Sequence, residues 1–414
     1  MPKLRTRPAM LLVAFLFCTV MASSAQSTFF TSLVSFDGTD GAFPTAALVQ
    51  ASDGNFYGTT SGDNCSYGCG TVFKLTSAGT LTTLYSFCSQ PNCSDGATPV
   101  AGLVQGSDGN FYGTTLDGGA YCLPQGCGTV FKITPEGTLT TLYNFCSAPN
   151  CTDGYNPEGV LVQAADGNFY GTTWGGGASH FGLGTVFKIT PEGSLTTLHS
   201  FQGYPTEGAR PYAGVVEASD GNFYGTTDLG GAYCGPGGCG AVFKITPTGT
   251  LSTVYSFCAQ SGCFDGALPV AALVQASDGN FYGTTQDGGT GRCGGQFGCG
   301  TVFRITSNGL TTLHRFDGSD DARPEAPLVE AADGNFYGTT IGNPYYLGSV
   351  FKITPAGMLT TLHRFDLTDG AIVFAGLVQG SDGAFYGTTY GGGAYGYGTI
   401  YTLGLVRPCA TCRP

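Results

Sequence analysis

The octapeptide DGNFYGTT occupies residues Asp53–Thr60, and the same eight letters occur five more times in the chain. The further copies begin at Asp108, Asp166, Asp220, Asp278 and Asp333, and a near copy, DGAFYGTT, begins at Asp382. Consecutive copies start 55, 58, 54, 58, 55 and 49 residues apart. Repeats of this length indicate either a solenoid or a β-propeller.

Four short β-prone stretches make up each repeat. In the first repeat, AALVQAS (46–52) precedes the pair Asp53-Gly54, which favours a two-residue type I′ hairpin turn, and NFYGTT follows. A Gly-rich loop leads to GTVFKLT (70–76), and a short turn leads to LTTLYSF (81–87). Four antiparallel strands per repeat predict one propeller blade.

The two ends of the array predict a closed ring. The last repeat stops after its third strand, GTIYTLG (398–404), and six fourth strands lie inside the array. A stretch of the missing type, TSLVSF (31–36), stands near the N-terminus. An open solenoid does not need this segment, whereas a ring needs it to complete the last blade. We expect an all-β fold, a seven-bladed β-propeller of four-stranded antiparallel blades closed by the N-terminal strand.

The octapeptide DGNFYGTT and the segment GTVFKITPEGTLTTLYNF (128–145), which recur with small changes over roughly residues 30–406, resemble the GloVer tandem-repeat family of secreted bacterial proteins. The resemblance implies a propeller-like array at an extracellular or surface location. It implies no activity and supplies no catalytic residues. Such proteins often end in a sorting or anchoring tail, but the end of this chain, VRPCATCRP, contains no apolar stretch.

The N-terminus is typical of a secretory signal. Lys3, Arg5 and Arg7 precede the apolar run AMLLVAFLFCTVMA, and small residues stand before Gln26. The apolar run is short for a membrane span. We expect a signal peptide at 1–25, the propeller at 26–406 and a short Cys-containing tail at 407–414. The mature protein should be secreted, extracellular or periplasmic, without membrane insertion.

The charge balance narrows the class of partner. Without the signal, the chain holds 13 basic and 28 acidic residues, which gives a net charge of −15. This charge disfavours nucleic acids and anionic membranes, and it permits cations, neutral sugars and basic proteins. We expect a monomer whose partner is an extracellular glycan or protein.

Loop lengths distinguish the two faces of the predicted propeller. The Asp-Gly hairpins and the turns before the fourth strands share one face, the constant face, and hardly vary in length. The loops between second and third strands and those between blades share the other, the variable face. Function usually resides in variable loops on a rigid scaffold, so we expect any site on the variable face.

Sixteen cysteines remain after the signal, and they form close pairs. Seven pairs lie in variable-face loops, and each loop holds both members or neither. In an exported protein this pattern favours disulfides within loops, with bridges between neighbouring loops or zinc binding as alternatives. The pairs are Cys65/Cys69, Cys88/Cys93, Cys122/Cys127, Cys146/Cys151, Cys234/Cys239, Cys258/Cys263, Cys293/Cys299 and Cys409/Cys412.

A carboxylate stands thirteen residues before every octapeptide. Because it precedes the innermost strand, the seven copies could ring one mouth of the channel as a cation site or polar rim. Alternatively, each carboxylate caps its own turn. No calcium-loop consensus is present, so calcium is only a candidate, and no cofactor is expected. The predicted acidic rim is Asp40, Asp95, Asp153, Glu207, Asp265, Asp320 and Asp369.

Aromatic residues gather in the same variable loops. Rings beside Gly and carboxylates are typical of carbohydrate platforms, where an apolar sugar face stacks on a ring. The alternative is that these rings only pack over the blade ends. The candidate ligand-binding residues are Trp174, His180, Tyr121, Tyr233, Tyr345, Tyr346, Tyr390 and Tyr395.

A basic residue recurs at one register of six third strands, where we expect either an ion pair within the scaffold or a side chain whose stem packs on the blade, rather than a ligand site. No nucleophile elbow, HExxH motif or phosphate loop is present. We therefore expect a non-catalytic binding scaffold for a glycan or protein. The alternative is an extracellular propeller enzyme, a polysaccharide lyase or hydrolase that uses loop carboxylates. The basic residues are Lys74, Lys132, Lys188, Lys244, Arg304 and Lys352.

Overall fold

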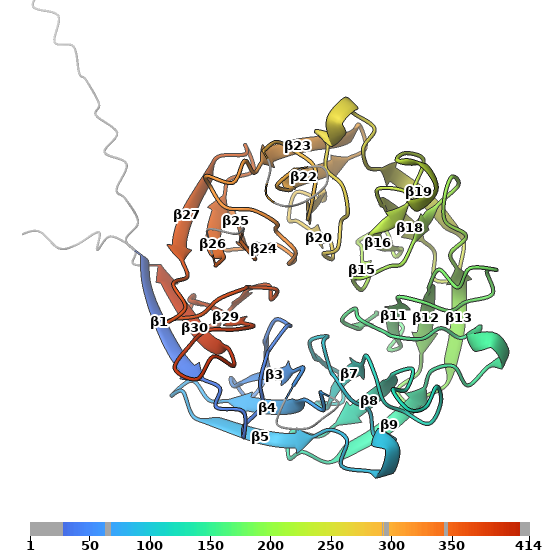
Figure 1. Cartoon of the computed structure of the whole chain (residues 1–414), viewed down its shortest axis with the longest axis vertical. Helices are drawn as coiled ribbons and strands as arrows, with labels where there is room; N and C mark the ends of the chain where they lie inside the picture. The colour runs from blue at the N-terminus through green and yellow to red at the C-terminus, as the bar shows by residue number, and fades with distance from the viewer. Residues whose placement is uncertain (1–27, 63–67, 292, 294–297, 343–346, 406–414) are drawn as a thin grey trace, which may run out of the picture.

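Seven four-stranded antiparallel sheets form a ring in the computed structural model, which describes residues 28–62, 68–291, 293, 298–342 and 347–405 (Figure 1). The predicted fold class and number of blades are confirmed. The expected signal peptide and C-terminal tail lie outside the described residues. Within the described part, no helix has the length and apolar character that a membrane crossing requires.

Each blade runs outward from the axis in the order of its strands. The innermost strands are β2 (Val49–Gln50), β6 (Val104–Gln105), β10 (Val162–Gln163), β15 (Val216–Glu217), β20 (Val274–Gln275), β24 (Val329–Glu330) and β28 (Val378–Gln379). The second strands are β3 (Phe56–Thr60), β7 (Phe111–Thr115), β11 (Phe169–Thr173), β16 (Phe223–Thr227), β21 (Phe281–Thr285), β25 (Phe336–Thr340) and β29 (Phe385–Thr389).

The outer half of each blade holds its third and fourth strands. The third strands are β4 (Thr71–Leu75), β8 (Thr129–Ile133), β12 (Thr185–Ile189), β18 (Ala241–Ile245), β22 (Thr301–Thr306), β26 (Ser349–Ile353) and β30 (Thr399–Leu405). The fourth strands are β5 (Leu81–Ser86), β9 (Leu139–Asn144), β13 (Leu195–Ser200), β19 (Leu251–Ser256), β23 (Gly309–Arg315), β27 (Leu359–Arg364) and β1 (Thr28–Ser35). We number the blades 1 to 7 in this order.

The remaining elements lie in loops. They are the two-stranded ladder of β14 (Gly208–Ala209) and β17 (Leu229–Gly230) and the 3₁₀ turns η1 (Pro91–Cys93), η2 (Pro149–Cys151), η3 (Gly235–Gly237) and η4 (Ser261–Cys263).

The octapeptide supplies the contacts between blades. Tyr57 packs on Phe111 of the next octapeptide, and their ring centroids lie 4.1 Å apart. Six further Tyr–Phe contacts of 4.0–4.2 Å complete a closed aromatic belt. These are Tyr112–Phe169, Tyr170–Phe223, Tyr224–Phe281, Tyr282–Phe336, Tyr337–Phe385 and Tyr386–Phe56.

The glycine of the octapeptide permits close packing within the blade. A Cβ on Gly58 would lie 2.6 Å from Cζ of Phe73 and 2.8 Å from Cδ2 of Leu48. A ring thus lies directly against this glycine. Any larger residue would displace the Phe73 ring from the core.

The turn before the octapeptide strand differs from the predicted type I′ hairpin. The Ala51 N–H donates to the Asn55 carbonyl at 2.9 Å, and the Gly54 N–H donates to the Ala51 carbonyl at 2.9 Å. Gly54 has φ +80°, whereas Asp53 is not among the residues with positive φ. The loop is thus a three-residue turn with a glycine bulge, in which the Asp53 carboxylate accepts the Asn55 N–H at 3.0 Å.

Four of the six recurring basic residues form an ion pair on the constant face, which is one of the two roles expected for them. Lys74 Nζ lies 3.0 Å from Oδ2 of Asp53, which also accepts the Tyr57 hydroxyl at 2.9 Å. Burial would raise the pKa of Asp53, but bonds from Asn55, Lys74 and Tyr57 outweigh it and lower the pKa. Equivalent pairs are Lys132–Asp108, Lys244–Asp220 and Lys352–Asp333.

The N-terminal strand closes the ring as predicted. β1 lies beside β30 (Figure 1) and pairs with it in the antiparallel direction. Thr28 faces Leu405 in the register. The Phe36 N–H donates to the Gly398 carbonyl at 3.0 Å, and the Phe36 side chain is fully buried. The last blade therefore joins the two ends of the described chain.

Candidate functional site at the centre of the variable face

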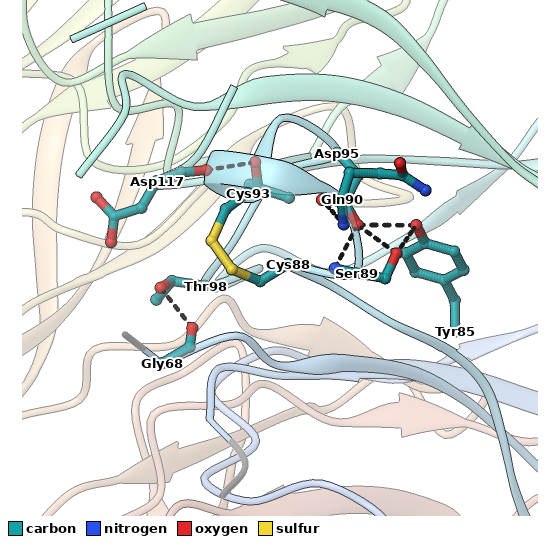
Figure 2. Close-up of a disulfide and its surroundings, with 10 residues drawn as sticks. Gly68, Tyr85, Cys88, Ser89, Gln90, Cys93, Asp95, Thr98 and Asp117 are labelled. Atoms are coloured by element: carbon teal, nitrogen blue, oxygen red, sulfur yellow. Dashed lines mark hydrogen bonds between the residues drawn. A yellow bond between two sulfur atoms is a disulfide. The ribbon is translucent and has the colours of Figure 1, made fainter. Parts of the chain in front are cut away.

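The carboxylates of the predicted acidic rim cap the loops that leave the fourth strands. Oδ2 of Asp95 accepts the Tyr85 hydroxyl at 2.8 Å and the Ser89 N–H at 3.0 Å, and its Oδ1 accepts the Gln90 N–H at 3.2 Å (Figure 2). Tyr85 belongs to the outer strand β5. This carboxylate therefore fixes the exit turn of blade 1 to its own outer strand.

Five further blades repeat this bond with a Tyr or His of the fourth strand. Asp40 differs, because β1 has Val34 at the matching position, and its Oδ1 accepts the Asp37 N–H at 3.1 Å. None of the seven carboxylates lines the axial cavity described below. The five pairs are Tyr143–Asp153, His199–Glu207, Tyr255–Asp265, His314–Asp320 and His363–Asp369.

The cysteine pairs form bridges within loops, as expected. Figure 2 shows the bridge between Cys88 and Cys93 beside the Asp95 cap. Cys69 is also bridged, whereas Cys65, Cys409 and Cys412 lie outside the described residues. The other bridges are Cys122–Cys127, Cys146–Cys151, Cys234–Cys239, Cys258–Cys263 and Cys293–Cys299.

Each segment that leads to an innermost strand is hydrogen-bonded to a loop of the preceding blade. In every blade, the residue before the repeated Pro, or before Val373 in blade 7, has φ of 52–59° and donates its N–H to a loop of the preceding blade. Asn156 donates to the Cys127 carbonyl at 2.9 Å, and Arg323 donates to the Cys299 carbonyl at 2.8 Å. The bridged loops thus position the residues that follow, and such left-handed non-Gly residues often cluster at functional sites.

An axial cavity of about 610 Å³ lies at these segments, where all seven blades meet. Its wall includes the residue that follows the repeated Pro, or Val373 in blade 7. This ring position is occupied by Thr45, Val100, Glu158, Tyr212, Val270, Glu325 and Phe374. Small residues of the next two positions, such as Ala46, Gly159 and Gly214, complete much of the wall.

One side of the cavity carries acidic groups with altered proton affinity. Burial raises the pKa of Glu158 to about 7, although a hydrogen bond from Tyr212 opposes the shift. Burial also raises the pKa of the Tyr212 hydroxyl, and the nearby Glu158 carboxylate adds to this effect. Asp228 lies close enough to interact with Glu158 and Tyr212. Burial raises the pKa of Asp228 to about 7, although the positive charge of Arg210 opposes this rise.

Glu325 is the second carboxylate in the cavity wall. Arg323 Nη2 lies 3.2 Å from its Oε1, and Gln286 Nε2 donates to the same oxygen. Burial raises the pKa of Glu325, and the charge of Arg323 and the Gln286 bond oppose this rise. Glu325 is thus an oriented acceptor, and Glu158 is a carboxyl group that can exchange a proton near neutral pH.

The opposite side of the cavity is aromatic. Tyr390 and Phe374 both belong to the wall, and their rings meet edge to face at 5.4 Å. Phe43 stacks on the outer side of this pair, with its ring centroid 4.9 Å from that of Tyr390. Of the aromatic candidates that lie in the described part of the chain, Tyr390 is the one in the cavity wall.

Trp174 lies beside the cavity but not in its wall. The Arg210 guanidinium covers its ring at 4.3 Å from the centroid. The arginine therefore occupies a face that a sugar would need for stacking. The positive charge of Arg210 also acts on Asp228, where it opposes the rise in pKa that burial causes. Trp174, Arg210 and Asp228 therefore form one cluster.

The other aromatic candidates are distributed over the outer part of the variable face. Tyr121, Tyr233 and Tyr395 are exposed, and His180 contacts the exposed Phe181 edge to face at 5.0 Å. These side chains do not line the axial cavity. Tyr345 and Tyr346 lie outside the described residues.

Sequence reasoning did not identify Glu158, Tyr212, Glu325 or Phe374. The sequence feature that could have identified them is one position of the repeat that varies between blades while its neighbours stay nearly the same. The residue after the repeated Pro changes among Thr, Val, Glu, Tyr and Phe, while the Ala/Gly-rich stretch that follows hardly changes. Because this position varies while the strand after it is nearly constant, seven similar blades can together form one asymmetric site.

Comparisons with known proteins agree with the fold. The sequence model of the Gloeobacter/Verrucomicrobia repeat matches residues 17–151, 123–294 and 289–407. No curated protein matches the chain. A fungal alcohol oxidase solved in complex with copper aligns with a TM-score of 0.57 over 92% of this chain and 76% of that chain, at 13% identity.

A second solved structure is a Thermus thermophilus protein described as a glucose dehydrogenase. It aligns with a TM-score of 0.45 over 91% of this chain and all (100%) of that chain, at 13% identity. At 13% identity, the likeness to the fungal alcohol oxidase concerns the fold alone.

Proposed function

The chain belongs to the Gloeobacter/Verrucomicrobia repeat family, and from that premise we propose that it is a non-catalytic scaffold that binds an extracellular glycan in its axial cavity. The observation that carries this proposal is the ring position after the repeated Pro. Seven otherwise similar blades differ there, and together they form a wall with an acidic side and an aromatic side.

The size and chemistry of the cavity support a sugar ligand. A volume of about 610 Å³ lies within the usual range of about 300–1,000 Å³ for small-molecule sites. Tyr390 and Phe374 offer ring faces or edges to the apolar side of a sugar, and Glu158 and Glu325 offer acceptors to its hydroxyls. A protein partner would need a broader surface than this cavity provides.

The proposed location is outside the cytoplasm. Six described disulfides are compatible with an oxidising compartment, and the N-terminal signal expected at 1–25 would direct export. The bridges brace the loops whose carbonyls hold the wall segments. A rigid wall lowers the cost of ordering a binding site.

Glycan-array binding of the mature protein tests this proposal. Tyr390→Ala and Glu325→Gln should each weaken any detected binding at least tenfold, because the first removes a ring that can stack on a sugar and the second removes a charged acceptor for its hydroxyls. Tyr395→Ala is the matched control, since Tyr395 is an exposed ring on the same face. Binding that survives both cavity changes, or that fails equally in the control, would place the site elsewhere.

One observation favours a second candidate function, catalysis on polysaccharide. A carboxyl group with a pKa near 7, as at Glu158, can act as a general acid at neutral pH. Asp228 has a similar pKa and lies near enough to influence Tyr212. Turnover of a polysaccharide that Glu158→Gln abolishes, with binding retained, would establish a lyase or hydrolase in place of a scaffold.

A further inference from the structure

Among the residues that the structure describes, two groups of four cysteines converge on the variable face. In each group, all four Sγ atoms lie within 4.8 Å of one another. Both groups follow the spacing C-x4-C-x18-C-x4-C, with one pair between the second and third strands and the other in the exit loop of the same blade. The blade 2 quartet is Cys122, Cys127, Cys146 and Cys151, and the blade 4 quartet is Cys234, Cys239, Cys258 and Cys263.

The stability of the blades does not explain this convergence. A bridge across about five residues contributes about 2 kcal/mol at most in the chain-entropy model. Blade 3 has no cysteine in its loops, yet its exit loop has the same kind of cap, from His199 to Glu207. Each bridge also closes only its own loop, so neither needs the other pair beside it.

A bridge between the second and third strands does not require a second pair in the exit loop. Blade 5 has the Cys293–Cys299 bridge between its second and third strands, but its exit loop has no cysteine. A single bridge therefore suffices to brace a loop of this type. In blades 2 and 4, the second pair stands where its sulfur atoms meet those of the first.

We propose that each quartet, once its two bridges are reduced, is a tetrathiolate site for a soft divalent metal ion of the zinc class. Zinc–sulfur bonds of about 2.3 Å in a tetrahedron separate the sulfur atoms by about 3.8 Å. The sulfur atoms already lie within 4.8 Å of one another, so small side-chain movements suffice.

The chemical balance needs a reductant, which we take to be a low-molecular-weight thiol. Each bridge accepts two electrons and two protons and gives two thiols, while two reductant thiols become one disulfide. Binding of one metal ion then releases the four thiol protons, because thiolates are the ligands. The metal-bound state differs from the disulfide-bonded state. One metal ion links the two loops to each other, whereas each disulfide closes only its own loop.

The site is coupled to the axial cavity in blade 2. The Cys127 carbonyl accepts the Asn156 N–H at 2.9 Å, and Asn156 stands two residues before Glu158 of the cavity wall. The Cys239 carbonyl holds Leu268 in the same way at 2.9 Å. The metal would thus hold the same loops that position the wall.

Metal titration of the full mature chain tests the proposal. The protein is reduced with a phosphine under anaerobic conditions, freed of reductant, and titrated with Cd²⁺ while thiolate-to-metal absorption is recorded. The pair changes C122S/C127S and C234S/C239S should each remove one tightly bound equivalent relative to the unchanged protein. The change C293S/C299S is the matched control and should remove none, because it affects an isolated pair.

Cysteines outside the described residues are present in the variants and in the unchanged protein alike. Any metal that they bind therefore does not affect the difference in bound equivalents. Loss of no equivalent in either quartet variant, or an equal loss in the control, would overturn the proposal. Equal binding by the oxidised protein would also overturn it. If reduction unfolds the chain, Cd²⁺ present during reduction should preserve its circular dichroism in the unchanged protein, and failure to do so counts against the site.

Discussion

The hydroxyl of Tyr143 on β9 lies 2.8 Å from Oδ2 of Asp153, ten residues further along the chain. The same oxygen accepts the Ser147 N–H at 2.9 Å. Tyr143 and Asp153 thus join the outer edge of blade 2 to the loop that leads to the next blade. This bond explains why Tyr and His exchange at one fourth-strand position, because both can donate to a carboxylate.

Removing this bond should lower stability in proportion to the groups left without partners. Tyr143→Phe removes one donor and should cost about 1 kcal/mol of unfolding free energy. Asp153→Ala also leaves the Ser147 N–H without its acceptor and should cost about 1–3 kcal/mol. Urea denaturation measures both, with the exposed Thr140→Ala on the same strand as the control. Equal stability of the Asp153 variant and the control would contradict the structural role.

The octapeptide glycine should not tolerate a methyl group. A Cβ on Gly113 would lie 2.6 Å from Phe131 Cζ and 3.0 Å from Leu103 Cδ2, so Gly113→Ala should cost about 1–3 kcal/mol. Phe131→Leu on its own should also destabilise. In the double variant the two costs should be less than additive, because the smaller side chain makes room. Strict additivity in urea denaturation would show that the two positions do not compete for space.

The fold was predictable because the octapeptide makes the same contacts in every copy. Tyr57 packs on Phe111, and Gly58 lies beneath Phe73, so repetition of the letters means repetition of the packing. The turn type was not predictable from Asp-Gly alone. The Asp53 carboxylate binds the Asn55 N–H, which stabilises a turn with one left-handed residue instead of two.

The site was less predictable because its residues do not repeat. The sequence drew attention to Asp153 and its equivalents, because they share a motif. These carboxylates recur in every blade because they stabilise the exit loops of the blades, not because they form a binding site. Glu158 and Tyr212 have no counterpart in most blades, and only the ring geometry brings them together. Trp174 looked available for stacking, because the sequence does not show that Arg210 covers it.

Glu158 should make stability depend on pH near neutrality. Its pKa is raised to about 7 in the folded protein, above the ordinary value of 4.5, so folding takes up a proton between these values. Its cost is therefore greatest above pH 7 and disappears as the pH falls towards 4.5. Glu158→Gln should raise the unfolding temperature at pH 8 but change it little at pH 4.5.

Thermal unfolding at several pH values measures this difference. Glu136→Gln, on an exposed turn of the constant face, is the control and should leave the pH profile of the unfolding temperature unchanged. Asp228→Asn should act in the same direction as Glu158→Gln, because burial raises its pKa to about 7 as well. A Glu158 variant whose profile parallels that of the unchanged protein would show that this carboxyl group is not desolvated.

Closure by β1 should decide whether the ring is one cooperative unit. The segment 28–36 contributes the fully buried Phe36 and the stacking of Phe30 on His363 at 3.8 Å, and it covers the outer edge of β30. Deletion of residues 28–36 would expose that edge and break the junction between blade 7 and blade 1. We expect the truncated protein to unfold at a markedly lower temperature, because these contacts are lost, and the exposed edge of β30 should also make it prone to aggregation.

A synthetic peptide TFFTSLVSF should restore the unfolding temperature when added in excess, whereas a scrambled peptide should not. Retention of the original unfolding temperature by the truncated protein would show that the other six blades hold the ring without this strand.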